Sequence, residues 1–128
     1  HLEAFDRETR EQQAERVLKV FKSYASEYPI ILMGDFNSRP PFATEIIEVE
    51  KTINIFMKDA LISEAISKDR YLGDEQLFFT FNTDQPYERL DYIFYNTNKI
   101  RKIDSDVLRE AADISDHLPV WMTFTMIE

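Results

Sequence analysis

The sequence predicts an α/β fold in which helices cover a mixed sheet. Three observations indicate this class: a long segment with helical periodicity, a short and wholly apolar run directly after it, and several strand-like segments further on. A helix, a buried strand and then further strands is the pattern of a layered α/β sandwich. With 128 residues, 44% of them hydrophobic, the chain has the size of one domain and enough apolar side chains for a core.

Residues 7–27 are predicted to form the long helix. Asp6 is suited to cap its first turn, and Pro29 ends it. Apolar side chains recur every three or four residues, at Ala14, Val17, Leu18, Phe21, Tyr24, Ala25 and Tyr28. The charged side chains of the opposite face are expected to face solvent: Arg10, Glu11, Glu15, Lys19 and Lys22.

The next segment, 30–33, is apolar on both faces. Such a run predicts a buried strand with a helix behind it. Gly34 opens the loop that follows, Pro40-Pro41 closes that loop, and residues 43–51 are predicted to form a short helix.

The rest of the chain is expected to be mainly β-structure. Residues 52–76 show no clear pattern, and a loop at 115–119 precedes the last strand. The predicted strands are 78–81, 90–95, 100–108 and 120–127. The aromatic side chains of this part are expected to lie in the core rather than to stack on nucleic-acid bases: Phe78, Phe79, Phe81, Tyr92, Phe94 and Trp121.

Composition excludes several classes of protein. The chain has no cysteine, which excludes a disulfide scaffold and a thiolate metal site. Its 15 basic and 24 acidic residues give a net charge of −9, which disfavours non-specific binding to nucleic acid or anionic membranes. A phosphate substrate stays possible, because a bound metal ion inverts the local charge. No apolar run approaches the ~20 residues of a transmembrane segment. Localisation stays open between the cytoplasm and export from a bacterium.

Three short segments place polar side chains at the ends of predicted strands. They contain Asp35 with Asn37, then Asp91, and then Asp116 with His117. Loops at strand ends are where scaffolds present functional groups. Carboxylates suit hard cations such as Mg²⁺, and a histidine beside carboxylates suits proton transfer.

Together these segments resemble the endonuclease/exonuclease/phosphatase superfamily, the fold of pancreatic deoxyribonuclease. The matching motifs follow the family order over essentially the whole chain: Gly-Asp-Phe-Asn at 34–37, Arg-Leu-Asp-Tyr-Ile at 89–93 and Ser-Asp-His-Leu-Pro-Val at 115–120. His1-Leu2 looks like the end of the family's Asn-Thr-His-Leu strand, and Phe79-Thr80-Phe81 is similar to a weaker family element. The opening His-Leu-Glu-Ala-Phe-Asp resembles uncharacterised bacterial members.

The resemblance implies a role for each matched residue. Asp35 would be the general base for the attacking water, and Asn37 would bind a phosphate oxygen. His117 would contact the scissile phosphate, and Asp91 would fix the tautomer of His117. The implied reaction is metal-assisted in-line attack of water on a phosphodiester or phosphomonoester.

The resemblance also implies a metal ion and further substrate contacts. Asp116 would lie at a site for Mg²⁺ or Mn²⁺, and His1 would face the phosphate as a second histidine. Arg39, in the loop after Asn37, is a candidate phosphate contact. The substrate class (nucleic acid, phosphoinositide or phospholipid) stays unresolved, and the loops at 39–45 and 64–88 are expected to select it.

A complete family domain is about twice as long as this chain. The resemblance therefore implies that residues 1–128 are the C-terminal portion of the domain, half of a four-layer α/β sandwich with a mixed, largely antiparallel sheet. The N-terminal half, absent here, carries a principal metal ligand, so the chain alone is expected to be impaired or inactive. We expect the exposed sheet face to bind the missing half or to self-associate.

Several of these residues also have a purely structural explanation. Asp and Asn are frequent in turns, so Asp35 and Asn37 could simply form one. Asp91, expected in mid-strand where Asp is disfavoured, could pair with Arg89 or Lys99.

The same holds for the remaining matched residues. Asp116-His117 could be an ordinary loop pair, Arg39 a surface arginine, and His1 a frayed terminus. For the chain as a whole, the alternative to a hydrolase is a non-catalytic phosphate-binding or assembly module of the same fold.

Overall fold

A computed structural model describes residues 1–43 and 51–128. The helix predicted at 43–51 lies almost entirely outside the described residues. The helices are α1 (Arg7–Tyr24), α2 (Thr52–Met57) and α3 (Lys68–Gly73), with 3₁₀ helices at Glu75–Phe78 and Arg109–Ala111. The strands are β1 (Ile31–Asp35), β2 (Ile62–Glu64), β3 (Asp91–Asn96), β4 (Ile100–Val107) and β5 (Val120–Met126). None of the helices in the described part is long and apolar enough to span a membrane.

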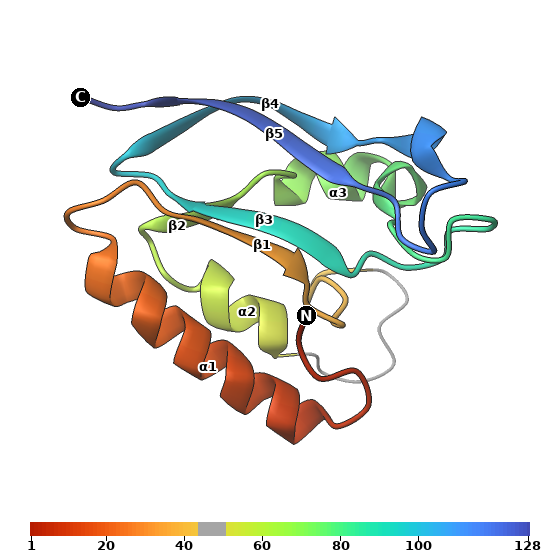
Figure 1. Cartoon of the computed structure of the whole chain (residues 1–128), viewed down its shortest axis with the longest axis horizontal. Coiled ribbons are helices and arrows are strands. Elements are labelled where there is room, and N and C mark those ends of the chain that lie inside the picture. The colour runs from red at the N-terminus through yellow and green to blue at the C-terminus, as the bar shows by residue number, and fades with distance from the viewer. Residues whose placement is uncertain (44–50) are drawn as a thin grey trace.

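The strands form two antiparallel sheets. One has the order β1-β3-β2, and the other is the β4-β5 hairpin. Figure 1 shows α1 and α2 on one face of the three-stranded sheet and the hairpin, with α3, on the other. The predicted α/β class is confirmed, and every strand pair of the described residues is antiparallel.

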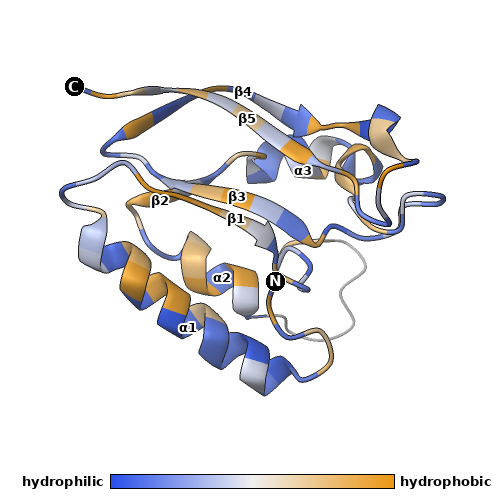
Figure 2. Cartoon of the chain, in the orientation of Figure 1, coloured by the Kyte–Doolittle hydropathy of each residue, from blue (hydrophilic) through white to orange (hydrophobic). Residues whose placement is uncertain are grey.

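Helix α1 begins where its cap predicts and ends three residues earlier than predicted. The Asp6 carboxylate accepts a hydrogen bond from Thr9 N at 2.9 Å, and the helix ends at Tyr24. Figure 2 shows the apolar stripe of α1 facing α2 and the sheet. The prediction that Arg10 faces solvent is wrong. Its side chain is buried, because its guanidinium donates to the carbonyl oxygens of Glu3 and Ala4 and so holds the segment before the helix.

The main core lies between these helices and the sheet. Phe36 is at its centre and makes edge-on contacts with the rings of Phe56, Tyr92 and Phe94, at centroid distances of 5.3–5.6 Å. The expectation that Tyr92 and Phe94 belong to the core is confirmed. Trp121 differs, since it lies on β5 and is 37% exposed.

Strand β1 is buried on one face only, which corrects the sequence prediction. Leu32 packs against the helix-side core, whereas Met33, whose side chain points to the opposite face, is 64% exposed. The reason is topological: β1 is an edge strand, and the hairpin does not cover its second face. Gly34 has φ +150°, a conformation that favours glycine.

The predicted strand at 78–81 is wrong. A 3₁₀ helix ends at Phe78, and only Phe81 forms isolated bridges, to Glu88 and His117. The unreadable segment 52–76 contains α2, β2 and α3. Each of these elements is six residues or shorter, too short for a periodic pattern to emerge.

Candidate active site

The register of β1 and β3 places two of the predicted carboxylates side by side. Asp35, the last residue of β1, is paired with Asp91, the first residue of β3. Directly opposite residues of an antiparallel pair point to the same face of the sheet. The sequence predicted Asp91 in the middle of its strand, and this is wrong: Asp91 is the first residue of β3.

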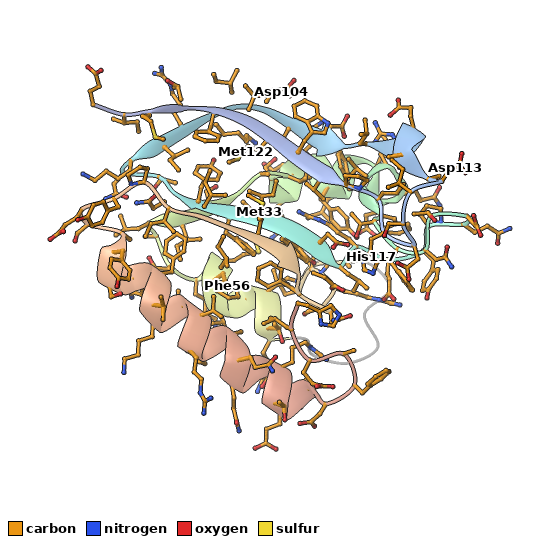
Figure 3. The ribbon with its side chains drawn as sticks, in the orientation of Figure 1. Met33, Phe56, Asp104, Asp113, His117 and Met122 are labelled. Carbon is orange, nitrogen blue, oxygen red and sulfur yellow. The ribbon has the colours of Figure 1, made fainter. Side chains whose placement is uncertain are left out.

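His117 approaches this pair from the loop before β5. Its Nδ1 lies 2.7 Å from Oδ2 of Asp91 and donates to that oxygen, so its Nε2 is directed elsewhere. Nε2 lies 3.7 Å from Oδ2 of Asp35. Figure 3 shows His117 at the end of the sheet near the N-terminus. The structure thus assembles the three predicted catalytic groups, and Asp91 orients the imidazole.

His1 and Asn37 lie on the other side of Asp35. His1 Nε2 is 3.5 Å from Oδ2 of Asp35 and 3.3 Å from Nδ2 of Asn37. The segment is held in place, because Leu2 N donates to the Asp35 carbonyl at 3.0 Å and Asn37 Nδ2 donates to the Leu2 carbonyl at 2.8 Å. The His1 side chain itself is 71% exposed, so it is open to a ligand.

Asn37 also has the turn role that the sequence allowed. Its backbone N donates to Oδ1 of Asp35 at 2.8 Å, and its φ is +47°. Asn is among the few residues that adopt this left-handed conformation readily. The turn and the site are therefore one feature, because this geometry turns the Asn37 amide toward His1.

The pKa values of both members of the Asp91–His117 pair (the dyad) are raised. Burial raises the pKa of the Asp91 carboxyl, although hydrogen bonds from Thr80 and His117 act to lower it. Burial alone would lower the pKa of His117, but its hydrogen bond to Asp91 and the negative charges of Asp91, Asp35 and Asp116 raise it above its ordinary value. The negative charges around His117 thus favour the protonated imidazole.

We expect the raised pKa of His117 to appear directly in an NMR titration of the chain in metal-free buffer. The midpoint should lie above the ordinary value of about 6.5, and Asp91→Asn should lower it. Folding favours the protonated form, so its contribution to stability is complete below about pH 6.5 and disappears as the pH rises through the raised pKa. The matched control is Asp59→Asn, because the carboxylate of Asp59 pairs with Lys22 and not with His117. A wild-type midpoint below 6.5 would contradict the assignment.

The described residues contain one group of side chains that could hold a metal ion. Ligand atoms of Asp35, Asp91 and His117 lie within 4.8 Å of one another. Asp91 and His117 are hydrogen-bonded to each other. Asp35 is therefore the carboxylate of this group that is better placed to contact a cation. Mg²⁺ accepts one or two protein carboxylates and retains waters. The group fits part of the coordination shell of such an ion.

The structure does not bring Asp116 or Arg39 into this group. Asp116 is exposed, and its carboxylate accepts a 3.4 Å hydrogen bond from Ser115. Nε of Arg39 donates to Oε2 of Glu88 at 2.8 Å, so a phosphate would compete with this ion pair. The roles of Asp116 and Arg39 stay predictions.

The structure excludes one structural alternative and adds one residue. Arg89 does not pair with Asp91, because its guanidinium donates to Glu64 at 2.9 Å. Thr80, which the sequence marked only as part of a weak motif, lies against the start of β3: its Oγ1 accepts hydrogen bonds from the backbone N of Leu90 and of Asp91, at 3.0 and 3.3 Å. The signal that could have revealed it is a hydroxyl residue set between apolar neighbours, Phe79 and Phe81.

Comparisons with known proteins show what the chain is similar to. Residues 1–117 match the model of the endonuclease/exonuclease/phosphatase family. A comparison with curated proteins found no match.

Solved structures show the same fold. They include an endonuclease/exonuclease/phosphatase from Bacteroides vulgatus (TM-score 0.71, 18% identity, 99% of this chain and 48% of that one). A mannosyl-6-phosphatase from Bacteroides thetaiotaomicron has TM-score 0.71 and 21% identity, with 98% and 49% covered. The human Nocturnin catalytic domain, solved with bound sulfate, has TM-score 0.69 and 22% identity, with 99% and 44% covered. The chain spans about half the length of these structures.

Proposed function

The chain belongs to the endonuclease/exonuclease/phosphatase family, whose members are phosphoesterases. On this premise we propose that it supplies the general base and the phosphate-binding side chains of a divalent-metal-dependent phosphohydrolase. The reaction is hydrolysis of a phosphodiester or phosphomonoester by in-line attack of water. The family match and the arrangement of the polar side chains at the ends of β1 and β3 support this proposal.

One observation carries the proposal: Oδ2 of Asp35 lies between two imidazoles, 3.5 Å from His1 Nε2 and 3.7 Å from His117 Nε2. A carboxylate in this position is suited to accept a proton from a water molecule. The imidazolium of His117, held by Asp91, is suited to bind a phosphoryl oxygen and to stabilise the negative charge that develops on it. The group suited to activate the nucleophile and the group suited to stabilise charge thus lie within 3.7 Å of each other.

The remaining residues bind the substrate and the ion. Asn37 Nδ2 and His1 are suited to donate to a second phosphate oxygen, and Asp116 would lie at the metal site, as the resemblance implies. A bound Mg²⁺ or Mn²⁺ supplies additional positive charge to the phosphoryl group. The mannosyl-6-phosphatase likeness supports a phosphate ester as the substrate at the level of chemistry only.

The enzymatic test is hydrolysis of a generic phosphodiester, bis(4-nitrophenyl) phosphate, by this chain. The chain alone is expected to be impaired or inactive, and in assays with Mg²⁺, with Mn²⁺ and with EDTA any turnover of its assembled form should require the metal. His117→Ala should lower any such turnover by about 10²–10⁴-fold, the usual contribution of one acid–base or charge-stabilising group. Turnover that survives EDTA or the His117 substitution would overturn the mechanism.

We propose further that residues 1–128 form the C-terminal portion of the domain. The chain spans about half of its structural relatives. A partly open cavity of about 320 Å³ lies between β1 and β5, where Met33 and Leu118 meet Asp91 and His117. An apolar cavity next to a reactive site is the surface that a second half of the sandwich, or a second copy of the chain, would cover.

Sedimentation of the purified chain tests this proposal. We expect dimers or larger species at micromolar concentration, and we expect Met33→Lys to shift them toward monomer, because a charge cannot be buried unpaired in an apolar interface. Ile103→Lys, at a residue of β4 that is also 64% exposed, is the matched control. A wild-type monomer that melts cooperatively would contradict self-association, and active monomer would contradict the need for a second half.

A further inference from the structure

The turn that carries Asn37 is attached to the start of β3 on both sides of that residue. On one side, Phe36 N donates to the Leu90 carbonyl at 2.9 Å, so the pairing of the two strands continues one residue beyond β1. On the other side, the Ser38 carbonyl accepts a hydrogen bond from the Tyr92 hydroxyl at 2.8 Å. Asn37, with φ +47°, stands between these two attachments in the chain. One of the two depends on a side chain and not on the backbone of β3.

The core holds the Tyr92 side chain in place. Tyr92 directly follows Asp91, a member of the dyad, and is 1% exposed. Its ring packs edge-on against Phe36 and parallel to Phe94, at centroid distances of 5.6 and 5.7 Å, and the Arg89 guanidinium lies 4.5 Å from its centroid. These contacts involve only the ring, and phenylalanine would make them equally well. The hydroxyl therefore has a separate role, because burying it without a partner would be costly.

The turn receives the stronger hydrogen bond of this hydroxyl. A tyrosine hydroxyl has one proton to donate. The Ser38 carbonyl lies 2.8 Å from the Tyr92 oxygen and the Arg89 carbonyl 3.2 Å from it. The shorter distance favours Ser38. Ser38 is itself only 2% exposed, so water has little access to replace the hydroxyl.

We propose that Tyr92 is the positioning residue of the Asn37 turn: by holding the Ser38 carbonyl, its hydroxyl keeps the Asn37 carboxamide beside His1. The backbone of the turn aims this carboxamide, whose Nδ2 donates to the Leu2 carbonyl at 2.8 Å and lies 3.3 Å from His1 Nε2. A turn that is fixed on one side only would leave the carboxamide free to move away from this partner. That the carboxamide binds a phosphate oxygen rests on the proposed function.

The order of the Asn37 side-chain amide, measured by ¹⁵N relaxation of the labelled chain in metal-free buffer, tests this proposal without turnover. In the wild type, the order parameter of Nδ2 should be near 0.85, the approximate value of a rigid group. Tyr92→Phe removes only the hydroxyl and should lower it below about 0.6, the approximate range of flexible groups. A variant that is less stable but still folded would keep the wild-type value, so a purely structural role of Tyr92 predicts no change.

Tyr71→Phe is the matched control. Tyr71 is also 1% exposed and packs against the same Arg89 guanidinium, 5.1 Å from its ring centroid, but it belongs to α3 and to the second core cluster. Its loss of a hydroxyl should leave the Asn37 amide ordered. Asn96 is an internal reference in the same spectra, because its Nδ2 is held by two carbonyls at 2.9 Å and should stay ordered in every variant.

An ordered Asn37 amide in Tyr92→Phe, or an equal loss of order in Tyr71→Phe or at Asn96, would overturn the proposal. If Tyr92→Phe does not fold, a through-hydrogen-bond coupling between the Tyr92 hydroxyl proton and the Ser38 carbonyl carbon decides it in the wild type: its presence supports the proposal and its absence overturns it. No substrate is needed, so the spectra stay interpretable if hydrolysis fails, and their failure leaves the hydrolase proposal standing.

Discussion

Asp35→Asn is expected to abolish phosphodiester hydrolysis in whichever species carries the active site, this chain as an assembly or the longer polypeptide. Loss of a general base costs about 10²–10⁴-fold in rate. The amide oxygen of Asn can still accept the hydrogen bond from Asn37 N, so the turn is kept. An amide has no basic oxygen to accept the proton of the attacking water. The measurement is kcat with saturating Mg²⁺, together with a thermal melt to confirm folding.

The control for this experiment makes the same change at Asp59. The two side chains are equally exposed, at 14%, but Asp59 pairs with Lys22 of α1 and lies far from the site in the fold. Asp59→Asn should leave kcat within about twofold of the wild type, as expected for a surface ion pair remote from the chemistry. Turnover by Asp35→Asn at the wild-type rate would remove Asp35 as the base.

Arg89→Met is expected to give the largest loss of stability among single substitutions of charged residues. The side chains of Arg89 and Glu64 are 1% and 3% exposed, and the guanidinium lies between the rings of Tyr71 and Tyr92, 5.1 and 4.5 Å from their centroids. Removing one member of a buried pair leaves the other charge without compensation and costs about 3–5 kcal/mol. Urea unfolding of the chain should show a lower midpoint with an unchanged slope.

Two further variants separate the buried charge from the lost packing. The double variant Glu64→Leu with Arg89→Met removes both charges and should recover most of the stability. Arg109→Met breaks an exposed pair with Asp106 and should cost less than about 1 kcal/mol. If Arg89→Met cost no more than Arg109→Met, the buried pair would not be a principal stabilising interaction.

Local patterns were sufficient to predict the longer elements. Helix α1 follows from its apolar spacing and its cap at Asp6, and β3, β4 and β5 coincide with predicted strands to within one or two residues. The short elements α2, β2 and α3 were missed, because an isolated element of this length is not stable by itself and depends on tertiary packing. The strand prediction at 78–81 failed for the same reason, since tertiary contacts set its conformation. The backbone of this segment forms hydrogen bonds with Glu88 and Leu118 and is not part of a strand.

The site divides in the same way between sequence and structure. The motifs identified Asp35, Asn37, Asp91 and His117, because each stands in a short segment with a distinctive composition. The resemblance implied that Asp91 accepts the hydrogen bond from His117, but the motifs could not show that Arg89 pairs with a residue other than Asp91, or that Thr80 lies against Asp91. Each of these depends on residues that are distant in the chain.

The sequence by itself determined the class of the fold, the positions of its long elements, the family, and the residue types available for chemistry. The tertiary structure alone decided the pairing of Asp35 with Asp91, the contact of His117 with Asp35, and the burial of Arg10 and Arg89. The physical reason is range: helical periodicity and caps act over a few residues, whereas strand register, hydrogen-bond partners and burial are set by segments that meet only in the folded chain.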